Sequence, residues 1–294
     1  MKNVALRKLL PYNNGIHLNW KEGMSMDSAV LFALGLTLFA GLATGIGSLI
    51  AFFASRTNTK FLSISLGFSA GVMIYVSMIE IFFKAKDSLT NAHGETMGYW
   101  LTLAGFFGGM IFMAGLDRIL PQLGNPHEVK TVEDMDDGPT NDEYARLRKM
   151  GIFTALAIGI HNFPEGIATF MSAIQDPALG VAIAIAVAIH NIPEGIAVSV
   201  PIYYATGSRK KAFQYSFLSG ISEPVGAIAA WLFLMPFLSD TLFGIIFAGV
   251  AGIMVFISLD ELLPAAKRYD EAHLSIYGLV AGMAVMAVSL VLIV

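Results

Sequence analysis

The feature that most limits what this chain can fold into is a series of long apolar runs that carry almost no charge. Eight such runs lie near residues 29–53, 61–83, 97–116, 151–173, 179–203, 212–234, 242–264 and 274–294. Each approaches or exceeds the roughly 20 residues that cross the hydrocarbon core of a bilayer as a helix. In lipid a helix satisfies its own backbone hydrogen bonds. We therefore predict an all-α integral membrane protein with eight transmembrane helices.

Composition supports this fold class, and the basic residues predict the orientation. Only 14% of the residues are charged, against about 25% in soluble domains. With the N-terminus outside, 12 of the 18 Lys and Arg residues fall in cytoplasmic connections, as the positive-inside rule favours. We expect both termini outside and residues 120–150 in a cytoplasmic loop. Residues 1–25 are predicted to be an N-terminal extension outside the membrane, and 26–294 a single eight-helix domain.

Two nearly identical polar insertions interrupt adjacent apolar runs. They read HNFPEGIATF at 161–170 and HNIPEGIA at 190–197. Residues i and i+4 share a helix face, so His161 lies beside Glu165, and His190 beside Glu194. At 1.5 Å per residue each cluster lies about 15 Å into its run, near the bilayer centre. Because the two runs are antiparallel neighbours, we expect the clusters to face each other.

These clusters have the composition of a metal site. One ionisable side chain at the bilayer centre costs about 2.5–3.5 kcal/mol on insertion scales, and a divalent cation would neutralise the carboxylates. Imidazole with carboxylate suits zinc, iron and neighbouring metals. Glu223, in LSGISEPVGA, adds a third carboxylate that suggests a second metal position or a bridge. The alternative is a structural polar network that sets the helix register.

Glycine and methionine near the clusters carry further expectations. Gly166 and Gly195 end the two motifs and allow a neighbouring backbone to approach closely. Met73, in the second run, is a possible soft ligand, although a buried methionine is more often core packing. The chain has no cysteine, which excludes thiolate ligands and disulfides.

A second repeat relates distant runs. Residues 70–82, AGVMIYVSMIEIF, align without gaps with residues 251–263, AGIMVFISLDELL. These runs cross the membrane in opposite directions, so the match indicates an inverted repeat, with helices 1–3 mirroring 6–8 in a 3+2+3 plan. Small-residue packing motifs that recur by chance are the alternative. The alignment pairs Glu80 with Glu261, which we expect either to guide ions at the outer and inner ends or to anchor the helices at the lipid interface.

At these motifs the sequence resembles the ZIP (Zrt/Irt-like) family of divalent metal transporters, most closely its bacterial ZupT-type branch. The resemblance covers nearly all of residues 26–294 and is carried by HNFPEGIATF, IAVAIHNIPEGIAVSVPIYYATGSRKKAF, SGISE and AGIMVFISLDELLP. It implies uptake of zinc, and also of iron(II), cobalt, manganese and cadmium, into the cytoplasm through a binuclear midplane site. The implied location is the inner (plasma) membrane of a bacterium.

The resemblance also implies which side chains hold the metal. The implied ligands are His161, Asn162, Glu165, His190, Asn191, Glu194 and Glu223. Glu165, His190 and Glu194, with His161 nearby, correspond to a zinc-type position. Asn162, Asn191 and Glu223 complete an iron-type position, with Glu165 and Glu194 bridging the two. Many relatives have a histidine-rich loop between helices three and four, whereas this stretch contains only His127.

The expected partners are divalent metal ions and the lipid bilayer, with no nucleic acid and no catalytic cofactor; a homodimer is left open. Two alternative functions remain at this point. One is a membrane-embedded di-metal carboxylate enzyme, against which the order His-x-x-x-Glu argues, because such enzymes use Glu-x-x-His pairs. The other is a metal sensor that transports nothing.

Overall fold

The chain folds as a set of long helices. Residues 28–53, 59–119, 159–268 and 273–293 are described by the computed structural model, and within them there are helices and no strand. The α-helices are α1 (Ser28–Phe53), α2 (Thr59–Val76), α3 (Phe82–His93), α4 (Glu95–Ile119), α6 (Pro177–Thr206), α7 (Arg209–Ala229), α8 (Asp240–Ile257), α9 (Leu263–Arg268) and α10 (Leu274–Ile293). Residues 159–175 are also helical. Shorter turns are η1 (Ser77–Ile81), η3 (Ala230–Leu234), η4 (Met235–Phe237) and η5 (Ser258–Leu262).

The predicted number of spans is confirmed. In the described ranges, seven helical stretches are long and apolar enough to cross a membrane: Ser28–Phe53, Thr59–His93, Glu95–Arg118, Pro177–Ile196, Arg209–Phe237, Asp240–Arg268 and Leu274–Leu292. The helix at 159–175 is an eighth helix, of which only 17 residues lie in the described ranges. The extension 1–25, the loop 120–150 and the first residues of the run 151–173 lie outside the described residues and stay predictions.

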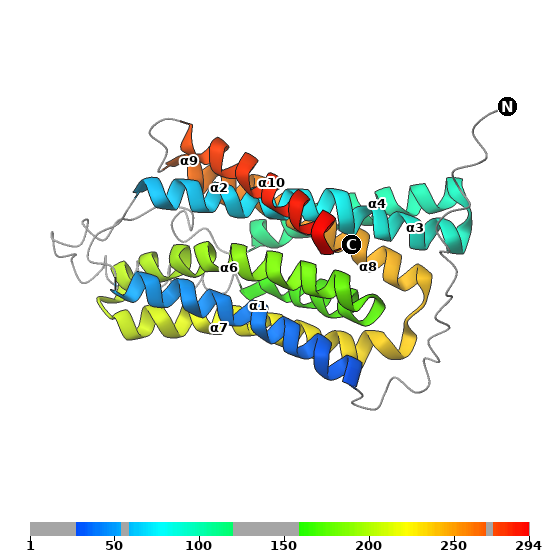
Figure 1. Ribbon diagram of the computed structural model, residues 1–294, viewed down its shortest axis with the longest axis horizontal. Helices are drawn as coiled ribbons and strands as arrows, with labels where there is room; N and C mark the ends of the chain where they lie inside the picture. Colours follow the sequence, from blue (N-terminus) through cyan, green and yellow to red (C-terminus); the bar gives the residue numbers. More distant parts are fainter. Residues whose placement is uncertain (1–27, 54–58, 120–158, 269–272, 294) are drawn as a thin grey trace.

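The helices form two groups. In one group α1 packs on α6 and α7, and in the other α2 packs on α10 and α9 while α4 and α3 pack on α8. The groups meet chiefly where α2 contacts α6. Figure 1 shows them as two layers, with α1, α6 and α7 in the lower layer and α2, α9 and α10 in the upper one. We call them the α6 group and the α2 group. The helix at 159–175 belongs to the α6 group, because it contacts α6 through Glu165 and His190 and α7 through Gly166 and Glu223.

Glycine is what brings the helices into contact within each group. A Cβ on Gly71 would overlap the backbone of Leu279 on α10, and a Cβ on Gly109 would overlap that of Gly249 on α8. Lipid provides no hydrophobic force between helices, so close packing of small residues has to hold them together. Gly71 and Gly109 thus serve close helix packing.

The two aligned stretches of the second sequence repeat share an unusual local structure. In each, a continuous helix passes through one π-helical turn, at Ser77–Ile81 and at Ser258–Leu262. The alignment pairs these residues one to one, so Glu80 and Glu261 occupy the same place in their turns. Inserted π-turns occur frequently at functional sites. Their place in these turns makes both glutamates candidates for a functional role.

Candidate metal centre

A tight turn sets the two HNxPEG motifs against each other. Asp176 alone separates the helix at 159–175 from α6. Its carboxylate accepts from the backbone N–H of Ala178 at 2.9 Å, and Pro177 occupies the first turn of α6, a favourable cap for a helix N-terminus. Beyond the turn, a Cβ on Gly180 would overlap Ala173. The two helices thus leave the turn antiparallel and in direct contact.

The first motif meets the second through a histidine and a glutamate. His190 Nε2 lies 3.2 Å from Glu165 Oε2, which confirms that the two clusters face each other. All seven candidate ligands are buried, and the most exposed, Glu194, retains only 6% of its accessible surface. Both helices continue without interruption through Pro164 and Pro193.

The third helix of the site is α7, which reaches the second motif. Asn191 Nδ2 donates to Glu223 Oε1 and, at 2.8 Å, to the carbonyl oxygen of Ala40 on α1. Both partners are acceptors, so the two N–H bonds of the amide are used. The Oδ1 atom of Asn191 must then point away from both partners. The predicted association of Glu223 with the HNxPEG pair is therefore present in the structure.

The first motif has different neighbours. Asn162 Nδ2 donates at 3.4 Å to the carbonyl oxygen of Ser219 on α7. His161 Nε2 lies 3.1 Å from Glu261 Oε1, a contact that joins the α6 group to the α2 group. The repeat alignment singled out Glu261, but only the packing of the two groups shows that its partner is His161. Glu80, its counterpart, lies 3.9 Å from Lys84 Nζ.

Several buried oxygens of the site have no hydrogen-bond donor. In the part of the chain that the structure describes, no donor reaches Asn162 Oδ1, Asn191 Oδ1, Glu194 Oε2 or Glu223 Oε2. A buried polar atom without a partner is costly, and a buried carboxylate more so. Carboxylate and amide oxygens are ligands for divalent ions, so bound cations would give such atoms partners.

The ligands are grouped in pairs. Across the described ranges, no three His, Asp or Glu side chains lie close enough together to form one metal cluster. His190 is held by Glu165, and Asn191 holds Glu223. Met73 is fully buried in the hydrophobic core, and its role as a soft ligand stays a prediction.

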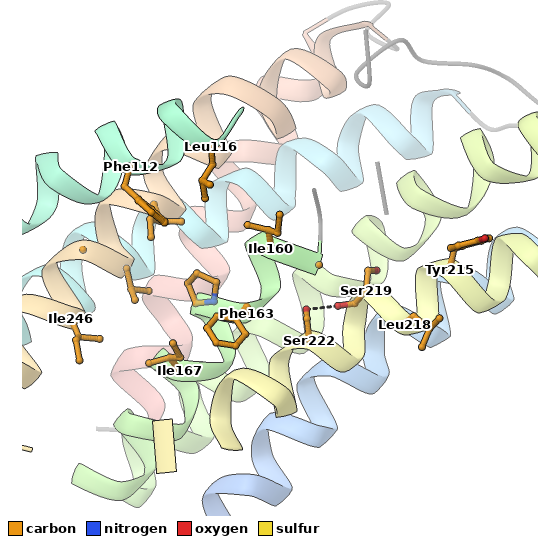
Figure 2. A pocket seen from close by; sticks show the side chains of 15 residues that line it. Phe112, Leu116, Ile160, Phe163, Ile167, Tyr215, Leu218, Ser219, Ser222 and Ile246 are labelled. Atoms are coloured by element: carbon orange, nitrogen blue, oxygen red, sulfur yellow. Dashed lines mark hydrogen bonds between the residues drawn. The ribbon is translucent and has the colours of Figure 1, made fainter. Parts of the chain in front are cut away.

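An apolar cavity of about 860 Å³ lies beside the helix at 159–175, which carries the first motif. Figure 2 shows Ile160, Phe163 and Ile167 at its wall, opposite Phe112 and Leu116 of α4. Further lining comes from α7 and α8, so the cavity separates the α6 group from the α2 group. Its two serines, Ser219 and Ser222, already donate to backbone carbonyls within α7. The cavity supplies space rather than metal ligands.

Comparison with known sequences decides the family. The sequence profile of the ZIP zinc transporters matches residues 122–290. The chain belongs to the ZIP family. This confirms the resemblance based on the HNxPEG motifs. ZIP proteins are transporters, so membership also confirms that the chain is not an enzyme and that its helices are those of a multi-pass membrane protein.

Relatives within the ZIP family match almost the whole chain. The zinc transporter ZupT of Lysinibacillus sphaericus (strain C3-41) is 76% identical over 269 residues, which make up 92% of this chain and 100% of that protein. ZupT of Oceanobacillus iheyensis is 70% identical over 268 residues, 91% of this chain and 100% of that protein. ZupT of Nitratidesulfovibrio vulgaris is 60% identical over 272 residues, 90% of this chain and 98% of that protein.

Proposed function

We propose that this chain carries zinc into the cytoplasm, and with it iron(II), cobalt, manganese and cadmium. The observation that carries the proposal is the set of four buried oxygens without donors, on Asn162, Asn191, Glu194 and Glu223. A site that only fixed helix register would satisfy its own polar atoms. Relatives that match the chain over nine tenths of its length are named zinc transporters, which favours zinc as the main cargo.

The site holds two metal positions in this proposal. Glu165, His190 and Glu194 bind zinc, with His161 nearby. The 3.2 Å contact between His190 and Glu165 supports that pair, and Glu194 moves toward it when zinc binds, because no three such side chains are grouped within the described ranges. Asn162, Asn191 and Glu223 form a harder position with the two bridging glutamates. Amide and carboxylate oxygens suit iron(II) and manganese better than imidazole does. The shared carboxylates couple the two positions.

Transport proceeds by alternating access between the two helix groups. All seven proposed ligands lie on the helix at 159–175, on α6 and on α7, so the cargo moves with the α6 group. The contact between His161 and Glu261 is made across the boundary between the groups, and it breaks when the groups shift. The apolar cavity beside Phe163 gives the boundary room to move. Release past Glu261 leads to the cytoplasm.

The protein sits in the bacterial inner membrane in this proposal, with both termini outside. The bias of 12 to 6 in basic residues supports that orientation. Cysteine accessibility tests it, since the chain has no cysteine of its own. Single cysteines in the loops should react with an impermeant maleimide on intact spheroplasts only at outer positions.

Uptake of radioactive zinc into proteoliposomes separates transport from binding alone. Vesicles with the wild-type chain should accumulate zinc down a gradient, whereas vesicles with Glu165→Gln, which removes one bridging charge, should not. If the purified chain binds zinc but moves none across the vesicle membrane, the chain is a metal sensor and the proposal fails.

A further inference from the structure

The two HNxPEG motifs dock onto their neighbouring helices by the same set of contacts. On α7 the carbonyl of Ser219 accepts from Asn162, and four residues later the backbone of Glu223 lies where a Cβ on Gly166 would be. On α1 the carbonyl of Ala40 accepts from Asn191. Four residues after Ala40, the backbone of Thr44 lies where a Cβ on Gly195 would be.

The correspondence extends to the surrounding glycines. Gly226 of α7 lies against the carbonyl of Phe163, and Gly47 of α1 lies against that of Ile192. Phe163 and Ile192 are the variable residues of the two motifs. Gly41 and Gly220 lie against each other's carbonyls. The stretch 40–47 of α1 therefore packs on the second motif in the same way as the stretch 219–226 of α7 packs on the first.

We infer from this correspondence that Thr44 occupies in α1 the position that Glu223 occupies in α7, and that its hydroxyl is a neutral oxygen ligand for the transported cation on the Asn162 side of the site. The inference rests on the proposed function, and it adds α1 to the helices that contact the cargo. Glu223 docks by its backbone on the first motif and reaches Asn191 of the second with its carboxylate. Thr44 likewise docks by its backbone on the second motif and turns its hydroxyl toward Gly220 of α7, so the same relation assigns it to Asn162 of the first motif.

The state of the Thr44 hydroxyl supports this role independently. Thr44 is fully buried, and no partner for its Oγ1 lies within the described ranges of the chain. A helical threonine ordinarily donates to the carbonyl three or four residues earlier, as Thr37 does to Leu34 at 2.9 Å. For Thr44 the carbonyl four residues earlier is that of Ala40, which already accepts from Asn191. The hydroxyl lies against Gly220 of α7, the residue after Ser219, whose carbonyl accepts from Asn162.

The difference between the two half-sites has a functional consequence. One half of the site contains Asn191 and the Glu223 carboxylate. The other half contains Asn162 and the neutral Thr44 hydroxyl, so only the first half carries the extra negative charge. That charge draws the hard cation to the Asn191 side. Moving the carboxylate from α7 to α1 should move the preferred position to the Asn162 side without destroying it.

An exchange of the two residues tests the inference. Iron(II) uptake into proteoliposomes is compared for Glu223→Thr alone, for Glu223→Thr with Thr44→Glu, and for Glu223→Thr with Thr37→Glu as the matched control. Loss of a ligand should lower uptake in the single variant by at least about 10-fold. The Thr44→Glu exchange should recover most of that loss, and the Thr37→Glu control should recover none.

The outcomes separate the two proposals. If Glu223→Thr takes up iron(II) at the wild-type rate, the proposed two-position site is wrong. If uptake is lost and Thr44→Glu recovers no more than Thr37→Glu, the site stands and the assignment of Thr44 is wrong.

A binding measurement covers the case in which the exchange variant does not insert into the membrane. Thr44→Cys changes the side chain little in size and introduces the sole thiol of the chain. With cobalt(II) bound to the full-length protein in detergent, Thr44→Cys should give a thiolate-to-cobalt charge-transfer absorption that Thr37→Cys lacks. Its absence from a Thr44→Cys protein that binds cobalt overturns the inference. Failure of the wild-type chain to bind cobalt would instead overturn the proposed function.

Discussion

The close backbone contact between Gly195 on α6 and Thr44 on α1 makes a quantitative prediction for Gly195→Ala. The new Cβ would overlap the carbonyl oxygen of Thr44 and lie 2.9 Å from its carbonyl carbon and 3.1 Å from the backbone nitrogen of Ser48. These are backbone atoms, which cannot rotate away as a side chain can. We expect α6 and α1 to separate by about 1 Å to relieve the overlap.

That separation would also displace a proposed metal ligand. Asn191 lies one turn before Gly195, and its Nδ2 donates to the Ala40 carbonyl across the same interface at 2.8 Å. An increase of about 1 Å takes this distance beyond hydrogen-bond range. Overpacking costs about 1–3 kcal/mol and the lost hydrogen bond about 1 kcal/mol. The free energy of unfolding should fall by about 2–4 kcal/mol, and loss of the group that orients a ligand should raise the KM for iron(II) by about 10–100-fold.

Gly35→Ala on α1 is the matched control. A Cβ there meets nothing within 4 Å, so the substitution should keep the wild-type KM and leave the melting temperature unchanged or higher, because alanine is favoured over glycine in a helix by about 1 kcal/mol. Uptake kinetics in proteoliposomes and thermal unfolding in detergent measure both effects. If Gly195→Ala and Gly35→Ala behave alike, backbone contact at Gly195 does not hold the site together.

Three further substitutions test other parts of the site. Glu194→Ala should reduce radioactive zinc uptake to the level of empty vesicles, because both metal positions share this carboxylate; wild-type rates would contradict the site. Glu223→Ala should lower iron(II) uptake at least about 10-fold more than zinc uptake, and equal losses would argue against two separable positions. Arg209→Ala removes the 2.7 Å hydrogen bond from Nη1 to the carbonyl of Phe52 at the end of α1. It should lower the free energy of unfolding by about 1 kcal/mol without changing the KM for zinc, and a changed KM would show that this end of α1 affects the site.

The membrane fold and the motif pair were predictable from the sequence because their signals are local. A run of apolar residues has to be a helix wherever lipid surrounds it, and the predicted runs agree with the described helices to within a few residues at most ends. The i, i+4 spacing of His190 and Glu194 places both on one face without any knowledge of neighbours. Gly195 was expected to admit a close backbone, and the contact with Thr44 confirms it.

The partners of these residues were not predictable in the same way. Nothing near His161 in the sequence indicates that its ring meets Glu261, a hundred residues later in the chain. The carbonyl of Ala40 is a backbone atom with no sequence signature, yet it orients Asn191. Such contacts depend on how each helix is rotated about its axis and on how near its neighbour comes.

Repeated membrane crossings, and imidazole, amide and carboxylate groups on two neighbouring helices, can be read from the order of the residues alone. Which oxygens are left without donors, and which helix packs on each motif, depends on the packing of the helices. The two kinds of information act over different distances. Hydropathy and helical periodicity act over one or two turns, whereas helix docking is decided by overlaps at single atoms, such as a Cβ against a carbonyl, between segments far apart in the chain.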